Sequence, residues 1–190
     1  MDKRKKADAP ANKMVASRPS DQPVSERTVI DCGDLHMRIA RDGTWFYHGS
    51  PIARKPLVKL FASVLRREAD GSYWLVTPVE RGCVEVEDVP FTAVELAVLG
   101  SGRSQSLRFR TNLDEWVEAG PERPIRVMPG DERSGPRPYV LVRDGLEALI
   151  LRPIFYELVA MAVLRTADTQ EWGVWSQGTF FPLAEASRCD

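Results

Sequence analysis

The feature that most constrains the fold is an amphipathic helix expected at residues 56–67. Apolar side chains recur there at helical spacing, and Pro56 suits a first helical turn, where its missing N–H loses no hydrogen bond. The expected apolar stripe consists of Leu57, Leu60, Phe61, Val64 and Leu65. Burying each of these side chains against a sheet contributes roughly 1.5–3 kcal/mol. This helix is therefore expected to anchor a domain that contains both helix and sheet.

Strand patterns lie on both sides of this helix. Residues 35–39 alternate apolar and polar side chains, and the Asp-Gly pair at 42–43 that follows is typical of a hairpin turn. After the helix, a second Asp-Gly pair at 70–71 leads into further strand-like sequence, which continues beyond residue 91. The proline and glycine residues of 120–138 disfavour a regular helix in that span.

The same order of elements recurs later in the chain. Arg-Asp-Gly ends a strand at 41–43 and again at 143–145, and each copy leads to a helix entered through a basic residue and a proline. The second helix is expected at 153–165, and an aromatic strand follows each helix. The sequence therefore predicts a repeated strand–strand–helix–strand–strand motif.

The length of the chain allows one large domain or two small ones, and the repeated motif, with strands and a helix in each copy, favours two small domains of the α+β class. The chain has 190 residues, of which 43% are hydrophobic, and this is sufficient for a buried core. The N-terminal α+β domain is expected at 28–87 and the C-terminal α+β domain at 88–190. Residues 1–27 carry seven Lys or Arg and four Asp or Glu among prolines and serines, which predicts a disordered basic tail.

The remaining sequence does not favour a surface that coats nucleic acid or a membrane. Residues 28–190 have 19 Lys or Arg against 23 Asp or Glu, so the folded part is mildly acidic. No apolar run is long enough for a transmembrane helix or a signal peptide. Cys32, Cys83 and Cys189 are far apart, without a CxxC motif or a nearby histidine pair, so reduced thiols of a cytoplasmic protein are expected.

Three longer runs of sequence, 41–82, 86–91 and 138–163, resemble an uncharacterised bacterial family that is catalogued as a domain of unknown function. The resemblance implies a duplicated core of two α+β domains, the second with a β-barrel-like character that is superficially similar to a pleckstrin-homology fold. It also implies binding at the domain interface and a role in signal transduction. It implies no reaction, no cofactor and no catalytic residue.

A basic cluster at the start of the first helix is a candidate anion site. Arg54, Lys55 and Lys59 gather at a helix end whose free N–H groups already favour negative charge, and Tyr47 and His48 precede them. A phosphate or an acidic peptide would suit this cluster. The alternative interpretation is an ordinary solvated helix end.

Turn residues that recur in the two copies are expected near the seam between the domains. Arg81, Arg143 and Asp144 either contact a ligand there or hold the loops through bonds to backbone carbonyls. The pattern leaves both interpretations open.

An enzymatic interpretation depends on His48, which could exchange protons with Glu80 or Asp42 in a small hydrolase or transferase. The chain has no G-x-S-x-G elbow, no GxGxxG and no Walker loop. Two separated histidines and dispersed cysteines give no zinc pattern. Neither a cofactor, a metal nor a catalytic residue is therefore expected.

The sequence favours a non-enzymatic cytoplasmic binding module. A protein or peptide is the expected partner, with an anionic small molecule or a nucleic acid as alternatives, bound at the domain interface. The expected ligand-binding residues are Tyr47, His48, Arg54, Lys55, Arg81, Arg143 and Asp144. No pattern specifies the ligand or the oligomeric state.

Overall fold

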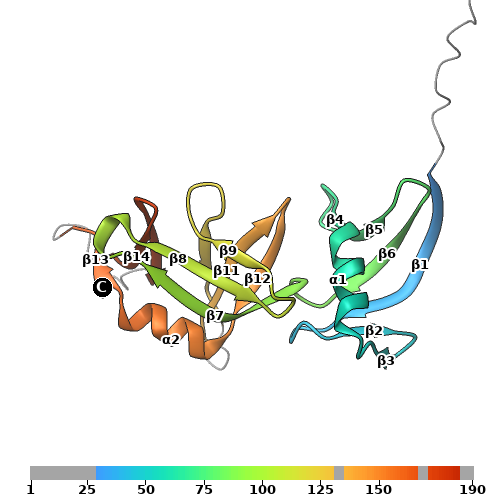
Figure 1. Ribbon diagram of the computed structural model, residues 1–190, viewed down its shortest axis with the longest axis horizontal. Coiled ribbons are helices and arrows are strands. Elements are labelled where there is room, and N and C mark those ends of the chain that lie inside the picture. The colour runs from blue at the N-terminus through green and yellow to red at the C-terminus, as the bar shows by residue number, and fades with distance from the viewer. Residues whose placement is uncertain (1–28, 131–134, 167–170, 185–190) are drawn as a thin grey trace, which may run out of the picture.

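The computed structural model describes residues 29–130, 135–166 and 171–184. Figure 1 shows two lobes side by side, the N-terminal lobe (residues 29–89) and the C-terminal lobe (residues 90–184). Both lobes combine sheet with a helix, which confirms the α+β fold class. The expected basic tail at 1–27 and the thiol of Cys189 lie outside the described residues.

The N-terminal lobe is a six-stranded sheet with helix α1 (Lys55–Val64) across one face (Figure 1). Its strands are β1 (Ile30–Ile39), β2 (Trp45–Tyr47), β3 (Ser50–Pro51), β4 (Leu65–Arg67), β5 (Tyr73–Val76) and β6 (Glu80–Val86). They lie in the order β3-β2-β1-β6-β5-β4, in which β1 and β6 run parallel and the other neighbours antiparallel. The expected turn at 42–43 joins β1 to β2, and Gly43 supplies its positive φ of 83°.

The C-terminal lobe contains a six-stranded sheet, a three-stranded sheet and helix α2 (Arg152–Ala160). Its strands are β7 (Phe91–Leu99), β8 (Ser106–Thr111), β9 (Trp116–Glu118), β10 (Ile125–Met128), β11 (Arg137–Arg143), β12 (Leu146–Ile150), β13 (Val163–Leu164), β14 (Trp172–Ser176) and β15 (Thr179–Ala184). The larger sheet has the order β10-β11-β12-β7-β8-β9 and the smaller one β13-β14-β15. In the larger sheet β12 and β7 run parallel.

The helix expected at 56–67 is present, but it ends earlier and turns a different face inward. Its last expected turn continues instead as the edge strand β4. Leu60, expected in the buried stripe, is 62% exposed, whereas Val58, Ala62 and Leu65 are buried. Because β4 pairs with β5 and Leu65 faces inward, the residues three and seven positions before it also face inward. The expected stripe was therefore displaced by about one position.

The second helix is also shorter than the expected 153–165. It ends at Ala160, and residues 163–164 form β13 instead. Only one face of this helix is buried, since Tyr156 is 62% exposed and Val159 is exposed as well. The buried face consists of Ile154, Phe155 and Leu158.

Most of the buried apolar side chains of the described residues form one cluster that continues through both lobes. In the N-terminal lobe, Trp45 is almost fully buried and stacks on Phe61 with ring centroids 6.3 Å apart. In the C-terminal lobe, Phe91 and Phe109 are among the largest fully buried side chains. Neither of the helices in the described residues is long and apolar enough to cross a lipid bilayer.

Candidate functional site

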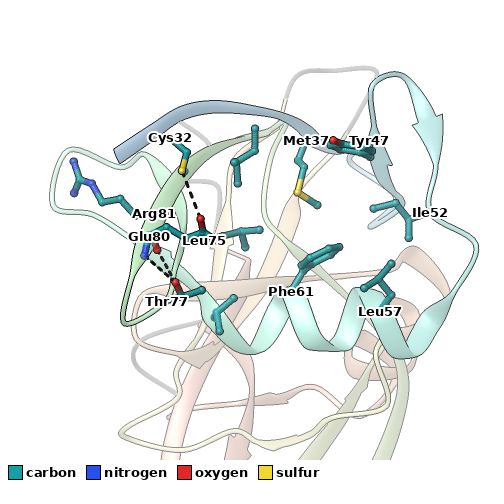
Figure 2. Close-up of a pocket in the computed structure, with 13 residues that line it drawn as sticks. Cys32, Met37, Tyr47, Ile52, Leu57, Phe61, Leu75, Thr77, Glu80 and Arg81 are labelled. Carbon is teal, nitrogen blue, oxygen red and sulfur yellow. Dashed lines mark hydrogen bonds between the residues drawn. The ribbon is translucent and has the colours of Figure 1, made fainter. Parts of the chain in front are cut away.

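A cavity of about 500 Å³ lies between α1 and the sheet of the N-terminal lobe. Figure 2 shows its lining side chains, which come from α1 on one side and mainly from β1, β5 and β6 on the other. We call this cavity the slot. The apolar side chains that line it are Leu35, Met37, Ile52, Leu57, Phe61, Val64 and Leu75.

The polar lining residues of the slot lie mostly at one end. Cys32, Thr77, Glu80 and Arg81 gather where β6 begins, and Figure 2 shows them at the opposite end from Ile52 and Leu57. Tyr47 lines the slot near its apolar end and is 52% exposed. The slot therefore has an apolar body and one polar end.

Hydrogen bonds within the chain fix the polar end. The Thr77 hydroxyl donates to the Glu80 carbonyl at 2.9 Å and accepts the Glu80 N–H at 3.0 Å, which closes the turn before β6. The Cys32 thiol donates to Oε2 of Glu80 at a sulfur–oxygen distance of 3.8 Å. Glu80 is thus held by its backbone, and its carboxylate meets the thiol.

Arg81 is committed to a neighbour outside the slot. Its Nε and Nη2 lie 3.1 and 3.0 Å from Oδ2 of Asp31, and its guanidinium stacks on the Trp74 ring at 4.4 Å. The pKa of the Asp31 carboxyl is lowered most by the hydrogen bond from the Gly33 N–H and next by the bond from Arg81. Arg81 therefore contributes its stem to the slot, and Figure 2 shows its guanidinium turned away from the cavity.

The surroundings of Cys32 disfavour the thiolate form of its side chain. Partial desolvation, followed by the charge of the neighbouring Glu80 carboxylate, raises the pKa of the Cys32 thiol. A nucleophilic cysteine needs a lowered pKa, because the thiolate is the reactive form. Cys32 therefore serves the slot as a weak hydrogen-bond donor. Cys32 and Cys83 are both free thiols, as expected.

The periodicity of the sequence identified the apolar residues of the helix that line the slot, but it predicted them to be core residues. Leu57, Phe61 and Val64 were expected to be buried against the sheet, and each is only partly buried because it faces the slot. Ile52 and Thr77 were not singled out at all. No local pattern marks a cavity whose walls come from separate segments of the sequence, residues 57–64 on the helix and residues 32–37 and 75–82 on the sheet side.

His48 lies on the exposed turn between β2 and β3, with a positive φ of 46°. Its ring contacts are His36 at 4.8 Å and Tyr47 at 4.4 Å between centroids. Glu80 bonds to Cys32 instead, and the Asp42 carboxylate accepts the Thr44 N–H at 2.9 Å. The structure therefore does not bring together the proton-transfer pairs that we considered.

The expected anion site at the start of α1 is filled by the chain's own carboxylate. Nζ of Lys55 and Nζ of Lys59 lie 2.7 and 2.8 Å from the two oxygens of Asp114, in the C-terminal lobe. Arg110 adds a third contact at 3.2 Å. The bonds from Lys55 and then Lys59 lower the pKa of the Asp114 carboxyl far below its usual range. Arg54, at the N-cap, is exposed and lies beside this cluster in sequence.

Arg143 lies at the seam between the lobes, where it joins α1 to the C-terminal sheet. It donates to the Ala62 carbonyl at 3.0 Å and to Oε2 of Glu115 at 2.6 Å, and its guanidinium lies 5.3 Å from the Phe91 ring. Asp144 follows in the exposed turn, with a positive φ of 42°. The expectation that Arg81 lies at the seam was wrong, because its guanidinium bonds to Asp31 on β1, within the N-terminal lobe.

The described residues contain no group of three or more His, Cys, Asp or Glu side chains placed to hold a metal ion.

Comparisons with known proteins place both lobes in one family. Residues 22–89 match the N-terminal domain model, and residues 90–183 the C-terminal domain model, of DUF1285, a protein of unknown function. No curated protein matches the chain.

Two crystal structures of DUF1285 family proteins are similar to this one. The protein from Silicibacter pomeroyi DSS-3 is 45% identical, with a TM-score of 0.77 over 89% of this chain and 90% of that one. The protein from Shewanella baltica OS155 is 27% identical, with a TM-score of 0.52 over 67% of this chain and 91% of that one.

Replacing Arg143 with Met should loosen the seam. The variant keeps the apolar stem but removes two charge-assisted bonds, so we expect the free energy of unfolding to fall by about 1–2 kcal/mol. Denaturant unfolding measures this change. The matched control is Arg54→Met, on an exposed residue, which should change the free energy by less than about 0.5 kcal/mol. Equal effects of the two variants would contradict the role of Arg143.

Replacing Asp114 with Asn should remove a contribution to stability that depends on pH. Because folding lowers the pKa of Asp114 below its unfolded value of about 3.9, the ionised carboxylate stabilises the fold above that pH. The contribution falls as the pH drops below about 4 towards the folded pKa. We expect the difference in unfolding free energy between wild type and variant to be constant from about pH 5 to 7 and to shrink at lower pH. A difference independent of pH would contradict this assignment.

Proposed function

We propose that this protein, which belongs to the DUF1285 family of unknown function, is a non-enzymatic binding module. It would hold the hydrocarbon chain of one ligand molecule in the slot. The observation that carries the proposal is the slot itself, a 500 Å³ cavity with an apolar body and polar residues mostly at one end. Cavities of a few hundred to about 1,000 Å³ with mainly apolar linings are typical of small-molecule sites. Its occupant would be an amphipathic molecule.

The shape of the slot favours a linear occupant. Leu57, Phe61 and Val64 line it at intervals of four and three residues, so the wall formed by α1 extends for roughly 10 Å along the helix. Leu75 and Met37 face them from the sheet (Figure 2). Apart from Tyr47 at its edge, this body is lined by apolar side chains that offer a sugar or a phosphate no hydrogen bond, whereas a hydrocarbon chain needs none.

The proposed site differs from the expected one in its place, because the slot does not lie at the seam between the lobes. The side of α1 that faces the C-terminal lobe is occupied by the contacts of Lys55, Lys59 and Arg143. The slot lies within the N-terminal lobe and is lined by residues 32–82 alone. Cytoplasmic location and a role in signal transduction stay predictions from the sequence.

A series of linear 1-alkanols from six to twelve carbons should test the proposal. Each alcohol would displace N-phenyl-1-naphthylamine, a neutral apolar fluorophore, from the protein. Because burying one methylene contributes about 0.8 kcal/mol, we expect the dissociation constant to fall roughly fourfold for each added carbon until the slot is full. Absence of fluorophore binding, or displacement that does not depend on chain length, would contradict the proposed function.

A pair of tryptophan variants on α1 locates the binding. Val64→Trp places a large ring in the slot and should weaken fluorophore binding at least about tenfold, roughly 1.4 kcal/mol. Leu60→Trp adds the same ring on the exposed side of the same helix and should leave binding unchanged. Circular dichroism would verify that both variants are folded. Equal binding by the two variants would place the fluorophore elsewhere.

A second candidate function is the recognition of an anion at the junction of the lobes. A hollow of about 420 Å³ there has Arg41 and Asp42 from the N-terminal lobe and Arg137 from the C-terminal lobe among its lining residues. Arginine pairs well with phosphate and carboxylate oxygens, which is why this hollow supports the expected anionic ligand. The Asp88 carboxylate already accepts a bond from Arg137, which reduces the free positive charge.

Calorimetry with inorganic pyrophosphate tests this second candidate. We expect binding at low ionic strength that Arg41→Gln weakens several-fold, while Arg54→Gln, which lies outside the hollow, leaves it unchanged. No heat from the wild type, or equal effects of the two variants, would contradict it.

We also infer that the two lobes contain the repeated motif. Antiparallel hairpins β1–β2 and β11–β12 precede the two helices, and antiparallel runs β4–β5–β6 and β13–β14–β15 follow them. The large sheet of the C-terminal lobe with α2 beside it supports a pleckstrin-homology-like character. Superposition of residues 30–86 on 137–184 is the test, and agreement limited to the helices would contradict the repeat.

A further inference from the structure

We infer that the occupant of the slot carries a head group that donates hydrogen bonds, such as an ammonium, a hydroxyl or an amide, and that Glu80 accepts from it. This inference rests on the proposed function, because it presupposes an apolar chain in the slot. It adds the chemistry of the ligand's polar end and the direction in which the chain lies. The head group would meet β6 at Glu80, and the tail would extend along α1 towards Leu57.

The donors at the polar end are already engaged. The Thr77 hydroxyl donates to a backbone carbonyl and accepts a backbone N–H, so it has little left to offer a ligand. The Cys32 thiol donates to Glu80. Arg81 donates to Asp31, and its guanidinium faces away from the cavity (Figure 2). A carboxylate or phosphate head group would therefore find no positioned donor among the residues that line this end.

The acceptor at the polar end is the Glu80 carboxylate. Its contact with the thiol is long and weak, 3.8 Å to Oε2, whereas a carboxylate can accept several bonds through its two oxygens. Figure 2 shows this carboxylate beside Cys32 at the end of the slot. A donor head group would form a stronger bond than the thiol does, because hydrogen bonds to ionised groups are short and strong.

The charge around this end has the sign that such a head group requires. The Arg81 guanidinium is paired with Asp31, and among the described residues no ion pair joins a cationic side chain to Glu80. Desolvation is the largest cause of the raised pKa of the Cys32 thiol, and the negative charges of Glu80 and then Asp31 raise it further. An anionic head group would be repelled there and a cationic one attracted.

Three ligands with the same ten-carbon chain test the inference. Decylamine, decanol and decanoate would each displace N-phenyl-1-naphthylamine at pH 7, below the concentration at which they form micelles. Because the head lies near solvent, we expect a moderate preference: decylamine should bind about five- to thirtyfold more tightly than decanoate, with decanol between them. In Glu80→Gln this preference should fall to about twofold or less, because the charge is lost while the turn bonds are made by the backbone.

The control variant is Glu85→Gln, on the same strand but outside the slot, which should keep the wild-type preference. Equal or tighter binding of decanoate to the wild type would overturn the inference. The inference would also be overturned if Glu80→Gln left the preference for decylamine over decanoate unchanged, or if Glu85→Gln abolished it. In these cases the shared decyl chain still binds, so the proposed function stands. Failure of all three ligands to displace the fluorophore would contradict the proposed function as well.

Discussion

The packing of one helix on a six-stranded sheet is the constraint from which the other features of the N-terminal lobe follow. Six strands spaced about 4.8 Å apart extend over roughly 24 Å, whereas a helix with its side chains is about 10–12 Å wide. α1 buries Val58 and Ala62 and cannot cover the rest of the apolar face. Leu35, Met37 and Leu75 on the sheet and Phe61 on the helix therefore line a cavity at the margin of the core.

The same helix connects the two lobes through its other side. Asp114 brings a carboxylate to Lys55 and Lys59, and Arg143 reaches back to the Ala62 carbonyl. The basic residues at the start of α1 thus bind an acidic group, as expected, but this group is the Asp114 carboxylate of the same chain. These exposed ion pairs contribute modestly to stability, so the apolar cluster shared by the lobes stabilises their arrangement more than the ion pairs do.

Local patterns predicted the elements well and their ends less well. The hairpin at Asp42-Gly43, the strand alternation before it and both helices entered through proline are present. Both helices end before the expected residue, because Leu65 and Val163 pair in strands that the helical pattern could not reveal. The exposure of Leu60, which was expected to be buried, shows a second limit of local patterns. A stripe of apolar residues gives the period of a helix but not the rotation at which it meets a sheet.

The sequence alone determined the α+β class, the positions of the strand–helix–strand units and the residue types that would meet anions, because these depend on neighbours a few positions apart. Tertiary structure decided which of these residues remain available to a ligand. Lys55 and Lys59 are committed to Asp114, at a separation of 55–59 residues, and Arg81 is committed to Asp31, at a separation of 50. Glu80 and the apolar walls of the slot became a candidate site only because β1 and β6 lie side by side. A cavity depends on distances between segments remote in sequence, and local periodicity does not encode them.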